Sequence, residues 1–181
     1  MSWTIDEAHT TIGFSARYMG LSTVRGRFGT FRGEVDIDPR DLTSSRGRIE
    51  IDMASVDTGD DTRDEHLRSA DFFDVENHPT MVFESKAVTP KGGDVFRVVG
   101  DLAIRGVTRE VEVDVEFAGE GVDPYGNRRL AGSLTGIIHR SEWGLKWNIA
   151  LEAGGLLVSD KIKIEVDGQL VESKAAAEET A

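Results

Sequence analysis

The chain has 181 residues, the length of one domain or of one domain with a tail. Hydrophobic residues make up 39% of it and 20 residues are glycine, a composition that excludes wholesale disorder. No apolar run approaches the roughly 18 to 20 residues that cross a bilayer, so we expect no membrane span. The net charge of −12 repels nucleic-acid backbones, so we expect no DNA or RNA partner.

Two absences narrow the chemistry and the location. The chain has no cysteine, which rules out disulfides, thiolate nucleophiles and zinc sites of the cysteine type. Its opening, residues 1–6, has no basic segment followed by an apolar core. We therefore expect a cytoplasmic protein.

Apolar and polar residues alternate along most of the chain, which is typical of half-buried strands. In the clearest example, Val111, Val113 and Val115 alternate with Glu112 and Asp114. The pattern predicts strands over residues 12–18, 24–28, 31–37, 49–53, 81–83, 96–104, 111–117, 134–138 and 162–166. The connectors are mostly short and rich in turn residues, which favours antiparallel neighbours. About eight strands of this kind predict an all-β sandwich or closed barrel.

Two stretches interrupt this strand pattern. Residues 60–69 begin with Asp60 and Asp61 and have Arg68 near the end, and this charge arrangement predicts one short helix. Residues 140–155 are irregular and carry two of the three tryptophans. We expect this second segment to cover an apolar surface.

The domain is expected to span residues 1–170, followed by a tail over 171–181. From Glu172 onward the chain has no large apolar side chain. Such a segment buries too little surface to offset the entropy of ordering it, so we expect the tail to be disordered.

The sequence contains none of the common catalytic spacings, such as a phosphate-binding loop, a dinucleotide fingerprint, a nucleophile elbow or a zinc-protease helix. The four histidines lie in separate segments, so a metal site would need distant parts of the chain to converge. We therefore expect no catalytic residue, metal or cofactor. An alternative makes His66, Asp64 and Arg63 the acid, base and anion clamp of an enzyme, although nothing supplies a nucleophile. In the simpler interpretation, Arg63 and Asp64 tie the helix to the sheet.

Glycines occur in the inward rows of several predicted strands, at Gly26, Gly33, Gly100 and Gly136. Two interpretations stay open. Glycine allows a strand to bend sharply where a small barrel turns its corner. Missing side chains also leave room, in a barrel of about eight strands, for one small ligand.

Several motifs occur in the order found in one known family. Residues 3–14 (WTIDEAHTTIGF) resemble its W-x-I-D-x-x-H-S/T start, and residues 55–58 (SVDT) and 63–74 (RDEHLRSADFFD) are similar to its S-I-D-T, R-D-x-H-L and D-F-F-D signatures. Residues 100–108 (GDLAIRGVT) and 140–144 (RSEWG) resemble its central hairpin and its R-x-D-F/W-G turn. The chain is thus identified as a member of the YceI family of bacterial polyisoprenoid-binding, lipocalin-like barrels.

The resemblance implies an antiparallel eight-stranded barrel whose elongated apolar cavity holds an isoprenoid or similar long-chain lipid. It implies no catalysis. We expect contacts with the lipid chain from Phe14, Tyr18, Phe28, Ile51, Phe72, Met81, Phe83, Leu102 and Trp143. Arg17 and His66 are expected near the head group. Many members have histidine where this chain has Tyr18, so the titratable ring is lost at that position.

The sequence therefore predicts a protein that stores or carries a long-chain amphiphilic lipid. Two other functions stay open: an enzyme that acts on an isoprenoid lipid, and a ligand-free barrel with a filled core that has a structural or stress role. A homodimer is also left open. Neither the lipid nor its head group is specified by the residues.

Overall fold

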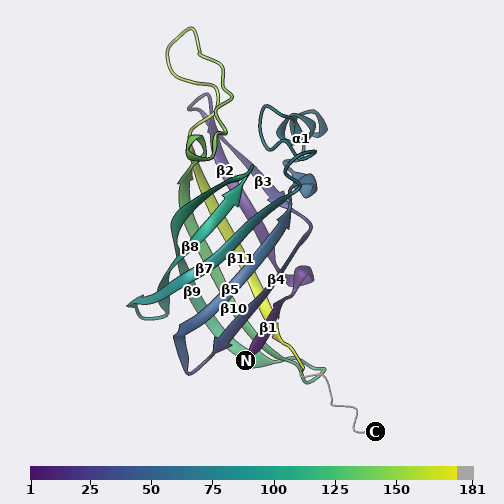
Figure 1. Cartoon of the computed structure of the whole chain (residues 1–181), viewed down its shortest axis with the longest axis vertical. Helices are drawn as coiled ribbons and strands as arrows, with labels where there is room; N and C mark the ends of the chain where they lie inside the picture. The colour runs from purple at the N-terminus through teal and green to yellow at the C-terminus, as the bar shows by residue number, and fades with distance from the viewer. Residues whose placement is uncertain (175–181) are drawn as a thin grey trace.

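The structure, a computed structural model, describes residues 1–174, which form one antiparallel barrel with a short helix at one end (Figure 1). In chain order the elements are β1 (Ser2–Ile5), η1 (Glu7–His9), β2 (Thr11–Tyr18), β3 (Ser22–Phe28), β4 (Phe31–Asp38), β5 (Asp41–Asp52), η2 (Met53–Ser55), β6 (Val56–Asp57), α1 (Asp61–Arg68), β7 (Thr80–Gly92), β8 (Val95–Ile104), β9 (Val107–Val122), β10 (Arg128–His139), η3 (Arg140–Trp143) and β11 (Lys161–Glu172). The elements labelled η are short 3₁₀ turns.

The sheet closes on itself. Its neighbours follow the order β1-β4-β5-β7-β8-β9-β10-β11, and β11 pairs back to β1 through Trp3 and Glu172. The other three strands extend members of this ring. β2 continues from β1 along β11, β3 leads into β4, and β6 follows β5. β3 pairs with β2 on one side and with β6 on the other. The expected all-β, eight-stranded antiparallel barrel is confirmed.

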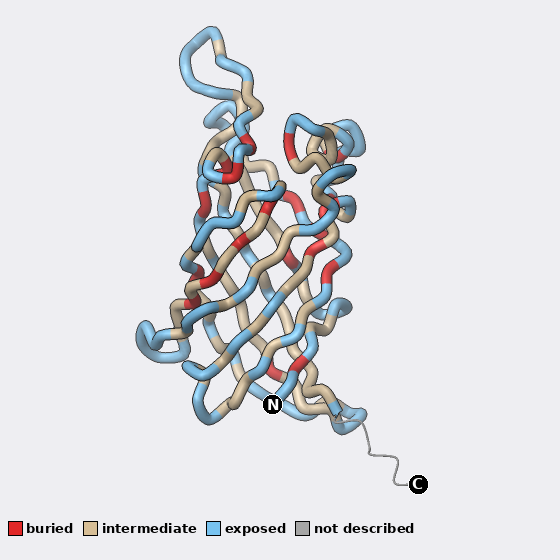
Figure 2. Tube along the Cα trace, viewed as in Figure 1, coloured by how far each residue is buried: buried red, intermediate tan, exposed pale blue. Residues whose placement is uncertain are grey.

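The period of two along the strands sorts side chains between the lumen and the solvent. In β8, Val98, Gly100, Leu102 and Ile104 are buried while the residues that alternate with them are partly exposed, and Figure 2 shows this alternation along the barrel wall. On the outer face, cross-strand ion pairs such as Arg48 Nη1 to Glu84 Oε2, at 3.2 Å, join neighbouring strands. Exposed pairs of this kind add little stability, so burial of the inward rows holds the barrel together.

Several strands are longer than the alternation predicted; β5, for example, begins at Asp41 rather than at Ile49. Met53 was expected to end a strand, but β5 ends at Asp52 and Met53 begins η2, because the Asp52 carboxylate accepts from the Ala54 N–H at the start of that turn. The alternation also did not predict β1, since four residues are too few for the pattern to be visible.

The boundary expected at residue 170 lies too early. Val171 and Glu172 belong to β11 and pair with Thr4 and Trp3 of β1. The next N–H, of Ser173, donates to Ser2 O at 2.9 Å. These residues are ordered by backbone pairing with β1, which needs no large side chain. Residues 175–181 of the predicted tail lie outside the described residues, so their disorder stays a prediction.

The two interruptions of the strand pattern both lie at the same end of the barrel (Figure 1). Helix α1 has the expected position, with Asp60 as the N-cap that accepts from the Arg63 N–H at 2.9 Å. The irregular segment begins with η3, and its first apolar residues, Trp143 and Leu145, are buried over the barrel end. Its middle part, 149–156, projects beyond the barrel instead (Figure 1). In the described residues, no helix combines the length and apolarity that crossing a membrane requires.

Candidate functional site

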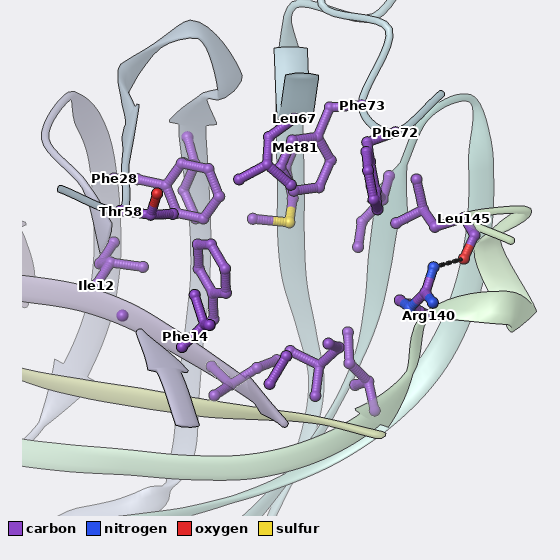
Figure 3. A pocket seen from close by; sticks show the side chains of 18 of the residues that line it. Ile12, Phe14, Phe28, Thr58, Leu67, Phe72, Phe73, Met81, Arg140 and Leu145 are labelled. Carbon is purple, nitrogen blue, oxygen red and sulfur yellow. Dashed lines mark hydrogen bonds between the residues drawn. The ribbon is translucent and has the colours of Figure 1, made fainter. Parts of the chain in front are cut away.

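The barrel encloses an apolar cavity of about 660 Å³. Phe14, Phe28, Met81 and Phe72 turn toward this space from different walls (Figure 3). A further cavity of about 250 Å³ lies nearer the opposite end, and the two share lining residues, so the apolar lumen is long. Side chains therefore do not fill the interior of this barrel, and the volume is one that small-molecule sites commonly have.

Two of the four inward glycines, Gly26 and Gly100, lie directly against aromatic rings. A Cβ added to Gly26 would lie 2.4 Å from Cζ of Phe14, and one added to Gly100 would lie 2.6 Å from Cζ of Phe83. Each ring thus occupies the place where its neighbour lacks a side chain. The glycines make room in the lumen indirectly, because they let these rings lie close against the wall.

Helix α1 is tied to the barrel beside the cavity mouth. Thr58 N–H and Oγ1–H donate to Asp64 Oδ1, at 2.8 and 2.6 Å, and Arg63 Nε and Nη2 donate back to Thr58 Oγ1 and O, at 2.7 and 2.8 Å. Arg68 adds a bond to Val56 O at 3.1 Å. Arg63 and Asp64 thus fix the helix to Thr58, the residue that follows β6, while Arg68 bonds to β6 itself. Asp64 is buried by these contacts, which leaves it poorly placed to serve as a catalytic base.

An aromatic cluster joins the helix side of the mouth to the irregular segment. The ring of His66 meets those of Trp147 and Phe72 edge to face, with centroids 4.6 and 5.0 Å apart. Phe72 and Trp147 are 5.3 Å apart. His66 Nε2 also lies 2.9 Å from Asp71 Oδ2. All three rings line the cavity at this end.

A buried guanidinium fixes the base of the irregular segment. Arg140 donates to the carbonyls of Leu145 (Figure 3), Trp147 and Ser159, at 2.7, 3.0 and 2.9 Å. Burial lowers the pKa of Arg140, while the nearby Asp160 opposes this shift. Burial alone would raise the pKa of Asp160, but hydrogen bonds from Ser141 and the positive neighbours hold it below its ordinary value. An arginine stays protonated at neutral pH even so, which places one permanent positive charge at the cavity wall.

Most residues predicted to contact the lipid chain do line the cavity, namely Phe14, Tyr18, Phe28, Ile51, Phe72, Met81, Phe83 and Leu102. Trp143 does not. It is buried in the core, and its Nε1–H donates to Leu102 O at 2.9 Å, so it supports the wall rather than facing the lumen.

Both residues predicted near a head group, Arg17 and His66, also line the cavity. The Arg17 guanidinium, however, donates to Thr23 Oγ1 and Gly20 O in the β2–β3 turn, at 3.0 and 3.2 Å. Within residues 1–174, no three His, Asp or Glu side chains gather as a metal site would need. Sequence reasoning missed a further set of lining residues, which includes Thr58, Leu67, Phe73, Arg140, Leu145, Trp147, Leu157 and Val158. The motifs at residues 55–58, 63–74 and 140–144 contain part of this set, but they did not show that these side chains face the lumen.

Comparisons with known proteins agree with this architecture. The YceI-like domain family matches residues 3–170. The UPF0312 protein of Staphylococcus epidermidis is 36% identical over 168 residues, 92% of this chain and 95% of that protein. The crystal structure of BcnA from Burkholderia cenocepacia is 27% identical with a TM-score of 0.75, covering 93% of this chain and 99% of that one. A polyisoprenoid binding domain from Saccharophagus degradans shares the fold, with a TM-score of 0.69 at 14% identity over 95% of this chain and 98% of its own. The chain belongs to the YceI family.

Proposed function

We propose that this protein binds one isoprenoid or similar long-chain amphiphilic lipid, as a store or carrier of that lipid. The observation that carries the proposal is the apolar cavity of about 660 Å³, continued toward the far end of the lumen. The Saccharophagus domain, described as polyisoprenoid binding, supports the same class of ligand for this fold. The cytoplasmic location and the homodimer stay predictions.

The polarity of the lumen favours one orientation of the ligand. At the α1 end the lining includes Thr58, Arg63, His66 and Arg140, which can face a polar head group. The opposite end, where Trp3 is fully buried, is lined mainly by aliphatic and aromatic side chains. We therefore place the head at the mouth and the chain along the lumen. Each buried methylene contributes about 0.8 kcal/mol, so ten ordered carbons give about 8 kcal/mol before the entropy of association is subtracted.

An enzyme acting on the same lipid has weaker support. The groups assigned to it already have structural partners: Arg63 and Asp64 are bonded to Thr58, and His66 contacts Asp71. No serine or threonine lies beside His66 as an activated nucleophile in the described hydrogen bonds. The arrangement suits holding a lipid better than transforming it.

Phe83→Arg tests the proposal, because it places an unpaired charge among the lining residues of both cavities. We expect a folded protein by far-UV circular dichroism that no longer binds a fluorescent isoprenoid. Ile137→Arg is the matched control, since Ile137 is an exposed residue on the outer face of β10 and should tolerate the same charge.

A Phe83→Arg protein that stays folded and binds as tightly as the parent would place this residue outside the site and contradict the proposal. Should this variant unfold, Phe83→Ala decides the question. The smaller side chain enlarges a true ligand cavity, so binding should shift toward bulkier lipids.

A further inference from the structure

Large apolar side chains gather in solvent at one end of the barrel. Leu21 is 77% exposed in the β2–β3 turn, and Leu156 is 55% exposed in the irregular segment. Tyr18, Met19 and Ile149, from the same two segments, are also exposed. Isolated apolar residues on a surface need no explanation, but a group of them on neighbouring loops marks an interaction site.

The two segments form one joined projection, here called the tip and defined as residues 18–22 and 147–158. Met19 N–H donates to Leu157 O at 2.7 Å, and Tyr18 forms a bridge with Val158. Within the second segment, Leu157 N–H donates to Ile149 O at 2.9 Å. In Figure 1 this second segment extends past α1 along the long axis of the barrel, so it is the first part to meet a surface placed across the mouth.

The apolar surface of the tip continues into the lumen. Tyr18, Trp147, Leu157 and Val158 belong to the tip and also line the large cavity. A lipid chain that leaves the cavity at this end therefore meets apolar side chains until it passes the tip.

Charge is depleted at the tip, and a cation precedes each of its two segments. Charged residues make up 30% of the chain, yet residues 18–22 contain none and residues 147–158 contain only Glu152. Arg17 and Lys146 immediately precede the two segments. An apolar projection with bordering cations matches the interface of a bilayer, where apolar side chains enter the acyl boundary and cations meet anionic head groups. A stable protein interface is instead a broad surface, typically about 800 Å² on each partner.

We propose that the tip docks the barrel, mouth first, onto the surface of a lipid bilayer. Leu21, Leu156 and Ile149 enter the boundary between head groups and acyl chains, while Arg17 and Lys146 stay at head-group level. The cavity mouth then faces the membrane, and a lipid chain can pass between bilayer and lumen without crossing water. The proposal rests on the proposed function for its purpose, but membrane docking is measured separately from lipid binding.

Sedimentation with vesicles tests the docking, using phosphatidylcholine alone and phosphatidylcholine mixed with phosphatidylglycerol. We expect the parent protein to bind the mixed vesicles more tightly. The double variant Leu21→Ser/Leu156→Ser should bind the mixed vesicles at least about tenfold more weakly than the parent, because two leucines no longer enter the bilayer. The control Val122→Ser/Tyr125→Ser removes exposed apolar side chains, 68% and 87% exposed, from the end of β9 and the connection that follows it, at the opposite end of the barrel, and should bind as the parent does.

Two results of the sedimentation assay would overturn the proposal: the parent binds neither type of vesicle, or the Leu21→Ser/Leu156→Ser variant binds as tightly as the parent. A third result, from light scattering, would also overturn it, namely that the parent is a dimer and the variant is a monomer. The last result would assign the tip to a second copy of this chain. Titration with a fluorescent isoprenoid, without vesicles, separates the two proposals. Neither Leu21 nor Leu156 lines the cavity, so the variant should keep the parent's affinity. A parent that binds vesicles but no isoprenoid contradicts the proposed function and leaves the docking standing.

Discussion

Gly26→Ala perturbs the lumen through a single methyl group. The added Cβ would lie 2.4, 2.7 and 3.0 Å from ring carbons of Phe14, and no backbone atom is among these contacts. Ordinary contacts begin near 3.4 Å, so the ring must move by at least about 1 Å. The wall blocks one direction, and the ring therefore turns into the open lumen.

The expected magnitudes separate binding from stability. Turning the ring away from its preferred rotamer costs about 0.5–1.5 kcal/mol, and the empty space beyond it accepts the movement, so the barrel should stay folded. The displaced ring takes space from the ligand. Losing the burial of two methylenes removes about 1.6 kcal/mol, so we expect isoprenoid affinity to fall by about tenfold or more.

Isoprenoid titration and urea unfolding of the same samples measure both effects. Gly29→Ala is the matched control, because its added Cβ meets nothing within 4 Å and its backbone needs no left-handed conformation. This control should bind as the parent does. If Gly26→Ala binds as tightly as the parent, or if it unfolds while Gly29→Ala does not, the seating of Phe14 does not keep the lumen open and the reasoning is refuted.

Three further predictions concern the mouth and the opposite end of the barrel. Arg140→Met removes the guanidinium that donates hydrogen bonds to buried carbonyl oxygens, and each unpaired carbonyl costs about 1–3 kcal/mol. We therefore expect a lower free energy of unfolding and faster proteolysis within residues 144–160. Unchanged values of both would contradict this role of Arg140. A hydrogen bond from Arg129 is the main cause that lowers the pKa of Asp6 below its ordinary value. A carboxyl group of this kind stabilises the fold at any pH above its pKa in the unfolded chain, and this stabilisation is lost as the pH falls through its lower pKa in the folded protein. Arg129→Gln should therefore destabilise the protein more at about pH 7 than at about pH 3 in urea unfolding, and an equal loss at both would count against it. His66→Ala should lower the melting temperature and keep isoprenoid binding, whereas an unchanged melting temperature with abolished turnover of a lipid would support the enzyme instead.

The barrel was predictable because its main signal is local. Alternation at Val111 and Val113 follows from the period of a strand and needs no knowledge of partners. The same alternation placed Phe83 and Leu102 on the inward side, where they line the cavity. Asp60 likewise indicated the start of the helix from its position alone.

Contacts between distant segments were not predictable in this way. The two interpretations of Gly26 missed its role, because the ring of Phe14 reaches it only through the register of β2 against β3. His66 and Trp147 are far apart in the chain and meet only once the barrel closes. The resemblance implied that Trp143 contacts the lipid, but its indole N–H donates to the Leu102 carbonyl, which holds it in the wall.

The central claim is that the lumen holds the chain of a long amphiphile. The most direct test is the affinity of the purified protein for prenols of increasing length, measured by calorimetry. Each isoprene unit adds apolar surface to be buried, so affinity should rise with length until the chain fills the lumen and then level off. The displaced Phe14 ring leaves the Gly26→Ala variant with a smaller free volume in the lumen. The affinity of this variant should therefore level off at a shorter chain. Affinity that does not depend on chain length, or no saturable binding of any prenol, would contradict the account.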